Sequence, residues 1–281
     1  NIYTLNNLNS LQELVIDSCP NITNISNKPS LKKISLYNME NLDYIDNLKN
    51  IKKIRIENCT QLTSITNINI VEEIEIYDSS IRSLPILNNL KTLTLINCYI
   101  IEYLHLYPKL TNLILRDCNF IYNLPILPFL QTLDIEYCDN ISIIPKYNKL
   151  DNLMLCNLKN LQYISNLKLL TNLEIYHCNN IYFITHIRYL DNLIISGCNN
   201  LINIPKFKQL RVFIIKNCKF YNDGRDINNI SYTDLYEFLQ IAISKLKKYF
   251  IKKRTNRLVL LYENDYLCDN VMDTIFSFRP I

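Results

Sequence analysis

An aliphatic pattern returns eleven times along this chain and restricts the folds that are open to it. The pattern is Leu/Ile/Val-x-x-Leu/Ile/Phe-x-Leu/Ile, and its first copy consists of Leu11, Leu14 and Ile16. Successive copies start 20 residues apart, except for one step of 19 residues from Val71 to Leu90. Chance does not hold such a register along most of a chain, so the pattern predicts stacked copies of one structural unit, which is a solenoid.

Each copy is expected to contribute one short strand to a common sheet. The apolar residues at positions four and six of the pattern alternate with other residues, which is the period of a strand with one buried face. Neighbouring strands lie about 4.8 Å apart, so eleven of them predict a parallel sheet on the order of 50 Å long. A single unit cannot bury its own face, so each needs its neighbours, and both ends of the stack need covering.

A cysteine follows the strand pattern by three residues in eight of the eleven units. The other three units carry Met39, Ser79 and Leu158 at this place. A small thiol suits a buried position, and no Cys-x-x-Cys pair is present, so we expect free core thiols and no metal site. Reduced thiols favour a reducing compartment, and we therefore expect a cytoplasmic protein. The cysteines of this ladder are Cys19, Cys59, Cys98, Cys118, Cys138, Cys178, Cys198 and Cys218.

The strand pattern and the inward cysteine together resemble leucine-rich repeats over residues 1–218. The short spacing is similar to the repeats of bacterial secreted effectors, and the cysteine is similar to those of plant immune receptors. This resemblance implies an α/β solenoid, a leucine-rich repeat horseshoe with about eleven repeats and one parallel strand per repeat. Proline after several outer-wall aliphatics, as in Leu84-Pro85, predicts extended segments or single 3₁₀ turns on the convex side.

Strand residues that point away from the core form columns on the concave face, where leucine-rich repeat proteins usually bind. Exposed apolar groups in a row usually mean that something covers them, and Tyr and Arg are enriched in binding hot spots. The alternative is that strand propensity favours Ile and Tyr on any sheet. In the first half, the candidate residues are Tyr37, Arg55, Glu57, Glu75 and Tyr77. In the second half, they are the aliphatic Ile114, Met154, Ile194 and Ile214, with Arg116, Glu136 and Tyr176 beside them.

The composition of the chain and the solvation of its sheet carboxylates argue against catalysis. The chain has 3 His and 2 Gly, so a glycine-rich phosphate loop is excluded, and carboxylates on an open sheet are solvated and keep ordinary pKa values. We expect neither an enzyme nor a cofactor. Cys156 is off the cysteine ladder on the open face, and it is the candidate for a reactive thiol, the alternative being a plain exposed cysteine.

The repeat pattern stops after Cys218, and residues 219–281 are expected to form a C-terminal capping region. Residues 231–250 read as an amphipathic helix that starts at a capping Ser231, and residues 258–262 read as a short strand. Basic residues between Lys247 and Arg257 suit a helix C-terminus, and they also suit nucleic acid, an acidic membrane surface or an import receptor. No run of about 18 apolar residues indicates a membrane span.

Two functions of different class remain from the sequence. The first is a non-enzymatic interaction module that binds a protein partner through the concave sheet face. Nucleic acid is not the expected partner, although a net charge of +4 neither demands nor excludes it. The alternative is a structural component of a virion or another large assembly. The scarcity of Ala, Gly and Trp beside abundant Asn, Ile, Lys and Tyr fits an AT-rich genome, such as that of a large DNA virus. The partner and the oligomeric state do not follow from the sequence.

Overall fold

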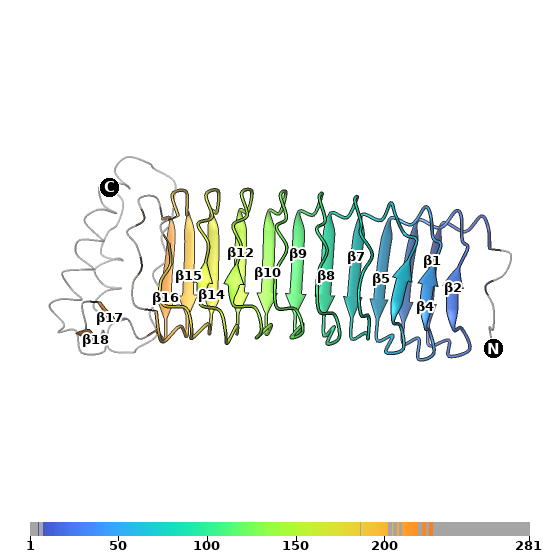
Figure 1. Cartoon of the computed structure of the whole chain (residues 1–281), viewed down its shortest axis with the longest axis horizontal. Coiled ribbons are helices and arrows are strands. Elements are labelled where there is room, and N and C mark those ends of the chain that lie inside the picture. Colours follow the sequence, from blue (N-terminus) through green and yellow to red (C-terminus); the bar gives the residue numbers. More distant parts are fainter. Residues whose placement is uncertain are drawn as a thin grey trace, which may run out of the picture.

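A parallel sheet of eleven strands forms one wall of the molecule (Figure 1). The computed structural model describes residues 5, 8–185, 187–201, 204, 207, 210–218, 221–222 and 225–226. Each copy of the sequence pattern supplies one five-residue strand, so the predicted one strand per repeat is confirmed. The strands in spatial order are β1 (Glu13–Asp17), β3 (Lys33–Tyr37), β5 (Lys53–Glu57), β7 (Glu73–Tyr77), β8 (Thr92–Ile96), β9 (Asn112–Arg116), β10 (Thr132–Glu136), β12 (Asn152–Cys156), β14 (Asn172–Tyr176), β15 (Asn192–Ser196) and β16 (Val212–Lys216).

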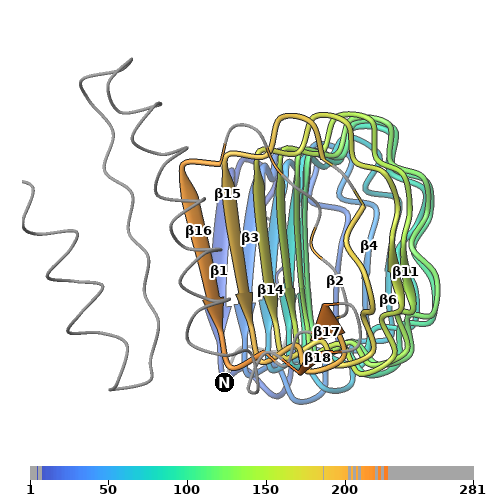
Figure 2. The ribbon, with the colours of Figure 1, turned by 90° about the vertical axis from the view of Figure 1, so that its left-hand side faces the viewer.

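Two short parallel sheets and connecting segments form the second wall of the solenoid. One sheet contains β2 (Asn24–Ser26), β4 (Tyr44–Asp46) and β6 (Ser64–Thr66), and the other contains β11 (Ile143–Ile144) and β13 (Tyr163–Ile164). Of the two conformations predicted for this side, the extended one is present, and the described residues include no helix and no 3₁₀ turn. In Figure 2 the middle turns, in green, lie farther from the open side of the long sheet than the terminal turns. The long sheet is therefore gently concave on its open face.

The repeat pattern places its aliphatic residues between the two walls. In β9, Leu113 and Leu115 are fully buried, whereas Ile114 between them points to the open face and is only partly covered. The same alternation repeats from strand to strand, because the register joins Leu113 to Leu133 and Leu133 to Leu153. Each strand thus buries its aliphatic face between the two walls and against the neighbouring turns, as expected of a solenoid.

A left-handed residue ends each strand of the long sheet. These residues have φ values from 49° to 68°, a region in which Asn, Asp and Gly are far less strained than other residues. Wherever another strand follows in the sheet, the N–H of this residue donates to a carbonyl of that strand, as in the 3.0 Å bond from Ser18 to Tyr37. The eleven residues are Ser18, Asn38, Asn58, Asp78, Asn97, Asp117, Tyr137, Asn157, His177, Gly197 and Asn217.

Side-chain amides join several of these left-handed residues across the turns. Asn38 Nδ2 donates to Asp17 at 2.9 Å, and Asn58 Nδ2 donates to Asn38 Oδ1 at 2.8 Å. Asn97 Nδ2 donates to Asp78 at 2.6 Å in the same manner. Asn at this place therefore both tolerates the left-handed backbone and links adjacent repeats.

The single 19-residue step removes one residue from a turn and leaves both walls in register. In the preceding repeat, Cys59 and the next buried aliphatic, Leu62, are three positions apart, whereas Ser79 and Ile81 are two positions apart. The strands β7 and β8 still pair along their full length, from Glu73–Thr92 to Tyr77–Ile96. A deletion inside a strand would instead have turned the following side chains to the opposite face.

The cysteine ladder lies inside the solenoid, as predicted. Six of its members are fully buried, and only the terminal Cys19 and Cys218 are partly exposed. The thiols hydrogen-bond to backbone carbonyls at the strand ends, as Cys118 does with Arg116 at 3.3 Å and with Leu95 at 3.5 Å. Burial raises the pKa of Cys178 to about 12, so the interior thiols stay protonated.

Beyond the repeats, β17 (Tyr221–Asn222) and β18 (Arg225–Asp226) form an antiparallel pair. The expected capping helix, the strand at 258–262 and the basic run between Lys247 and Arg257 lie outside the described residues, as do His186 and Cys268. The division into residues 1–218 and 219–281 therefore stays a prediction.

Candidate partner-binding face

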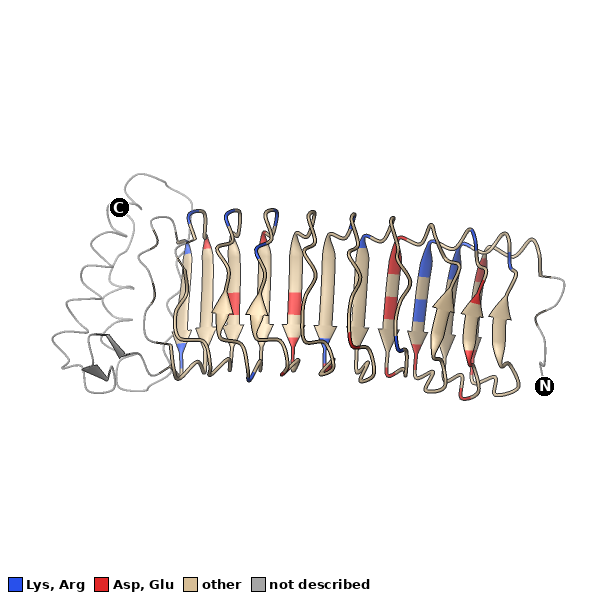
Figure 3. Ribbon diagram, in the orientation of Figure 1, with Lys and Arg blue, Asp and Glu red and all other residues tan. Residues whose placement is uncertain are grey.

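The open face of the long sheet, hereafter the sheet face, carries an excess of negative charge. Its strands contain eight Asp and Glu and five Lys and Arg, which gives three more negative than positive charges, although the whole chain has a net charge of +4 (Figure 3). The acidic residues are Glu13, Asp17, Glu57, Glu73, Glu75, Asp134, Glu136 and Glu174. The basic residues are Lys33, Lys53, Arg55, Arg116 and Lys216.

Residues from β5 and β7 form one polar group, hereafter the Arg55 cluster. Arg55 pairs with Glu75 at 2.6 Å and with Glu57 at 3.2 Å, and its guanidinium lies 4.7 Å from the centre of the Tyr77 ring. Tyr77 donates from its hydroxyl to Glu75 at 3.2 Å. Burial and the charge of Glu75 raise the pKa of Tyr77. The structure thus brings together four of the five residues predicted in the first half. The fifth, Tyr37, lies on β3, where the strand register places it opposite Glu57 of β5.

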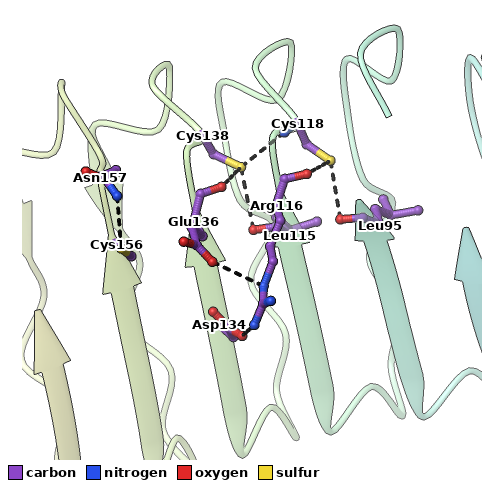
Figure 4. A network of polar contacts seen from close by, with 9 residues as sticks. All are labelled: Leu95, Leu115, Arg116, Cys118, Asp134, Glu136, Cys138, Cys156 and Asn157. Carbon is purple, nitrogen blue, oxygen red and sulfur yellow. Dashed lines mark hydrogen bonds and ion pairs between the residues drawn. The ribbon is translucent and has the colours of Figure 1, made fainter. Parts of the chain in front are cut away.

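A second polar group, hereafter the Arg116 cluster, lies across β9 and β10 (Figure 4). Arg116 pairs with Asp134 at 2.7 Å and with Glu136 at 3.4 Å. The hydrogen bond from Arg116 to Asp134 raises the pKa of the guanidinium. The sequence columns contained Asp134, but it was not among the predicted site residues. The signal that identifies it is its register position, since it stands beside Ile114 and carries a charge opposite to that of Arg116.

The aliphatic residues predicted in the second half do not form a continuous exposed strip. The register places them in the order Ile114, Asp134, Met154, Glu174, Ile194 and Ile214, so that a carboxylate separates the first three aliphatic residues from one another, whereas Ile194 and Ile214 are direct neighbours. All three aliphatic side chains, and Ile214 beyond them, are partly covered by their neighbours and are not among the exposed apolar residues. The expectation of exposed aliphatics on this face is therefore corrected, because side chains on adjacent strands are close enough to cover one another.

Tyr176 belongs to this alternating surface through its acidic neighbour. Its hydroxyl donates to Glu174 at 2.8 Å. Burial and this acceptor raise the pKa of Tyr176 to about 12. The second half of the sheet face thus combines carboxylates, partly covered aliphatics and a fixed tyrosine.

Cys156 is not the exposed thiol that its place outside the cysteine ladder suggested. It lies on the sheet face between Glu136 and Tyr176 of the adjacent strands, and only 9% of its surface is exposed. Its sulfur accepts a hydrogen bond from Asn157 Nδ2 at 3.1 Å (Figure 4). Burial, followed by the charge of Glu136, raises the pKa of Cys156 to about 11. A thiol with a raised pKa is a poor nucleophile at neutral pH, so this structure argues against a reactive role.

The exposed large apolar side chains lie almost entirely away from the sheet face. Of the eighteen such residues in the described part of the chain, only Val15 belongs to the long sheet. Tyr44, Tyr103, Ile143, Tyr163 and Phe183 lie on the second wall, and the other twelve lie on the two edges that join the walls. The sequence columns did not reveal this distribution, because only the sheet face was expected to bind.

Metal-ligating residue types do not gather into a site in the described part of the chain. There, no group of three or more His, Cys, Asp or Glu residues is placed to hold a metal ion. His105 packs edge-on against Tyr103 and Tyr107, with ring centres 5.2 and 6.4 Å away. His177 occupies a left-handed turn beside Gly197. In that same part of the chain, no helix combines the length and the apolarity needed to cross a membrane.

Comparison with known proteins finds similar chains among solved structures. No family model matches the chain, and no curated protein matches it either. One similar solved structure is the leucine-rich repeat domain of the type III effector XopL, with 22% identity and a TM-score of 0.39, over 56% of this chain and 64% of that domain chain. The match thus spans less than two thirds of that structure. Another is a leucine-rich cell surface protein from Faecalibacterium prausnitzii A2-165, with 10% identity and a TM-score of 0.32, over 76% of this chain and 80% of that chain. Both neighbours are leucine-rich repeat proteins, and the present chain is a parallel β-solenoid with 20-residue repeats.

Proposed function

We propose that this protein is a non-enzymatic interaction module, which binds a protein partner through the sheet face. The observation that carries the proposal is the pair of polar clusters around Arg55 and Arg116 on an acidic, gently concave surface. Both arginines are held by carboxylates on neighbouring strands, so their positions are set before a partner arrives. Preorganised side chains lose less conformational entropy on binding, and this favours affinity.

The charge of the sheet face specifies the chemistry of the partner. Three excess carboxylates on the described strands favour a partner surface that presents Lys or Arg side chains. Between these charges, Ile114, Met154 and Ile194 offer partly covered aliphatic contacts, and Tyr37, Tyr77 and Tyr176 offer aromatic ones. This combination suits an interface with a small apolar centre and a polar rim, as protein partners have, more than it suits nucleic acid, whose phosphates the carboxylates would repel.

The reducing environment inferred from the buried thiols supports a cytoplasmic site of action, and an origin in a large DNA virus remains part of the proposal. The expected lack of catalysis is supported by the covered thiol of Cys156 and its raised pKa.

The alternative function, a structural component of a virion or another large assembly, is supported by a different observation. Within the part of the chain that the structure describes, seventeen of the eighteen exposed large apolar side chains lie outside the sheet face.

Affinity capture with two matched variants tests the sheet face. One variant carries Tyr77→Ala, Arg116→Ala and Tyr176→Ala, and the control carries Tyr163→Ala and Phe183→Ala on the second wall. For each partner recovered by the unaltered protein, we expect the first variant to bind at least about 30-fold more weakly, because hot-spot truncations cost about 2 kcal/mol or more. The control is expected to retain binding. Unchanged affinity of the sheet-face variant for every partner would refute the proposal.

A further inference from the structure

The two edges that join the walls carry charges of opposite sign. The strand-start edge consists of the connections that lead from the second wall into the strands of the long sheet, and the strand-end edge consists of the turns that follow those strands. In the described residues, the strand-start edge has eleven cations and three anions, whereas the strand-end edge has two cations and six anions (Figure 3). The cations of the strand-start edge are Lys28, Lys32, Lys49, Lys52, Lys91, Lys109, Lys146, Lys149, Lys168, Arg188 and Arg211, and its anions are Glu72, Asp151 and Asp191.

Most of these charges have no counter-charge within the described part of the chain. Of the eleven cations, only Lys52, Lys91 and Arg211 form ion pairs there. On the strand-end edge, the anions are Glu40, Asp43, Asp78, Glu102, Asp117 and Asp139, and the cations are Arg82 and Lys159. Among these anions, only Asp139 forms an ion pair, with Lys159. Lys28 is buried and its Nζ donates to the Ser26 carbonyl at 3.2 Å, but the other unpaired charges leave each edge with a surplus that is available to another molecule.

Exposed apolar side chains accompany these charges on both edges, over the same turns. Among the described residues, they occur between β7 and β15, and six lie on each edge. The strand-start edge carries Ile86, Leu106, Ile126, Phe129, Leu169 and Tyr189. The strand-end edge carries Tyr99, Ile100, Phe120, Tyr122, Tyr137 and Tyr182. Apolar groups gathered in this way usually mark an interaction surface.

We propose that the strand-start edge of one molecule docks on the strand-end edge of a second copy of this chain. The two edges have opposite charge and matching apolar turns, and both repeat with the strand spacing of about 4.8 Å, so that contacts made by one turn recur at the next. The two copies are related by a shift along the strand direction. Such a head-to-tail contact uses two different surfaces and leaves one of each free, so it propagates into rows of molecules.

The dimensions of an edge are adequate for a specific contact. An edge about 50 Å long and about 10 Å wide between the two walls has a flat projection on the order of 500 Å². Protruding side chains raise the accessible area toward the roughly 800 Å² per partner of a standard interface. Every sheet face in such a row points the same way and stays open, so this inference does not depend on the proposed function. A lipid surface or a nucleic acid would use the basic edge alone, and the acidic, apolar strand-end edge favours the second copy.

Charge reversal on matched turns tests the docking. Lys49 and Glu40 lie on opposite edges of one turn, and Lys109 and Glu102 lie on opposite edges of another. The basic-edge variant carries Lys49→Glu and Lys109→Glu, and the acidic-edge variant carries Glu40→Lys and Glu102→Lys. All four residues are exposed, so both variants are expected to fold, which circular dichroism checks. A sheet-face control carries Tyr37→Ala and Tyr77→Ala.

Sedimentation equilibrium of the full chain supplies the measurement. For the unaltered protein and the sheet-face control at about 0.05 M salt, we expect the mean mass to rise above 33.3 kDa with concentration and to fall at about 1 M salt, where charges are screened beyond about 3 Å. Each charge-reversed variant alone is expected to associate about tenfold or more weakly. An equimolar mixture of the two variants regains association, because the unaltered strand-start edge of the acidic-edge variant can dock on the unaltered strand-end edge of the basic-edge variant.

Three results would overturn the inference. The first is a monomer of 33.3 kDa at all concentrations in low salt. The second is self-association of either reversed variant at the strength of the unaltered protein, and the third is a mixture that fails to regain it. A monomer whose basic edge instead retains phosphatidylserine vesicles or a single-stranded oligonucleotide would assign that edge to a polyanion.

Discussion

The left-handed residue that ends each strand leads us to predict that one surface substitution stabilises the protein. Tyr137 occupies this place with a φ of 51°, where most other repeats use Asn or Asp. A left-handed backbone costs a residue of this kind about 1–2 kcal/mol, and Asn largely avoids that cost through its short side chain. Replacing Tyr137 by Asn should therefore relieve about 1 kcal/mol of strain.

An asparagine at this place would also extend the chain of amide contacts. Its neighbours along the edge are Asp117 and Asn157, in the same arrangement in which Asn58 donates to Asn38 at 2.8 Å. Exposed hydrogen bonds of this kind add roughly 0.5 kcal/mol each. Against this, Tyr137 is 46% exposed and buries part of its ring, and losing that contact costs up to about 1 kcal/mol. The net expectation for Tyr137→Asn is a gain of about 1 kcal/mol, or a rise of about 2–4 °C in melting temperature.

Urea unfolding followed by far-ultraviolet circular dichroism measures this effect. Tyr137→Gly separates the two contributions, since it relieves the backbone strain without supplying an amide and should stabilise less than Asn. Asn58→Tyr is the reverse control, and it should cost about 1–2 kcal/mol by adding strain and removing the bond to Asn38. If Tyr137→Asn lowers the free energy of unfolding, or if Asn58→Tyr leaves it unchanged, the left-handed turn is not a source of stability here.

Three further predictions concern the sheet face and its edges. Cys156, whose pKa is raised to about 11, should react with iodoacetamide far more slowly in the folded protein at pH 7.5 than in urea. The reaction should become faster as the pH rises toward 11. Rapid labelling of the folded protein, read by mass spectrometry, would contradict the burial. Arg116→Ala should lower the free energy of unfolding by about 1 kcal/mol, and adding Asp134→Asn should restore part of this loss. A double-mutant cycle without coupling energy would show that the 2.7 Å ion pair contributes nothing to stability. Gly197→Ala should destabilise the folded protein by about 1 kcal/mol, because φ at this residue is 68° and the new Cβ would lie 2.3 Å from His177 Nδ1. Thermal melting of Gly197→Ala with and without His177→Ala should separate the effect of this contact from that of the backbone strain.

The columns of the repeat pattern predicted the side-chain contacts in the first half of the sheet face well and those in the second half poorly. The Arg55 cluster was predicted as a group, because its members occupy adjacent columns of neighbouring repeats and their opposite charges attract at short range. In the second half, the repeat columns listed Ile114, Met154 and Ile194 as a row, but Asp134 and Glu174 stand between them. Reading each column in spatial order, and not by residue type, would have found this alternation.

The 20-residue period, with the residues that repeat in it, determined the solenoid, the eleven strands and the inward cysteines, whereas it left the second wall open between extended segments and 3₁₀ turns. Period and burial are linked locally, because a strand alternates its side chains and each turn returns the chain by one strand spacing. The tertiary structure alone decided how far Cys156 is covered, which carboxylates hold Arg116, and how charge and apolar groups divide between the two edges. These properties depend on side chains from neighbouring turns that meet in space, and a column of letters does not contain the distances between them.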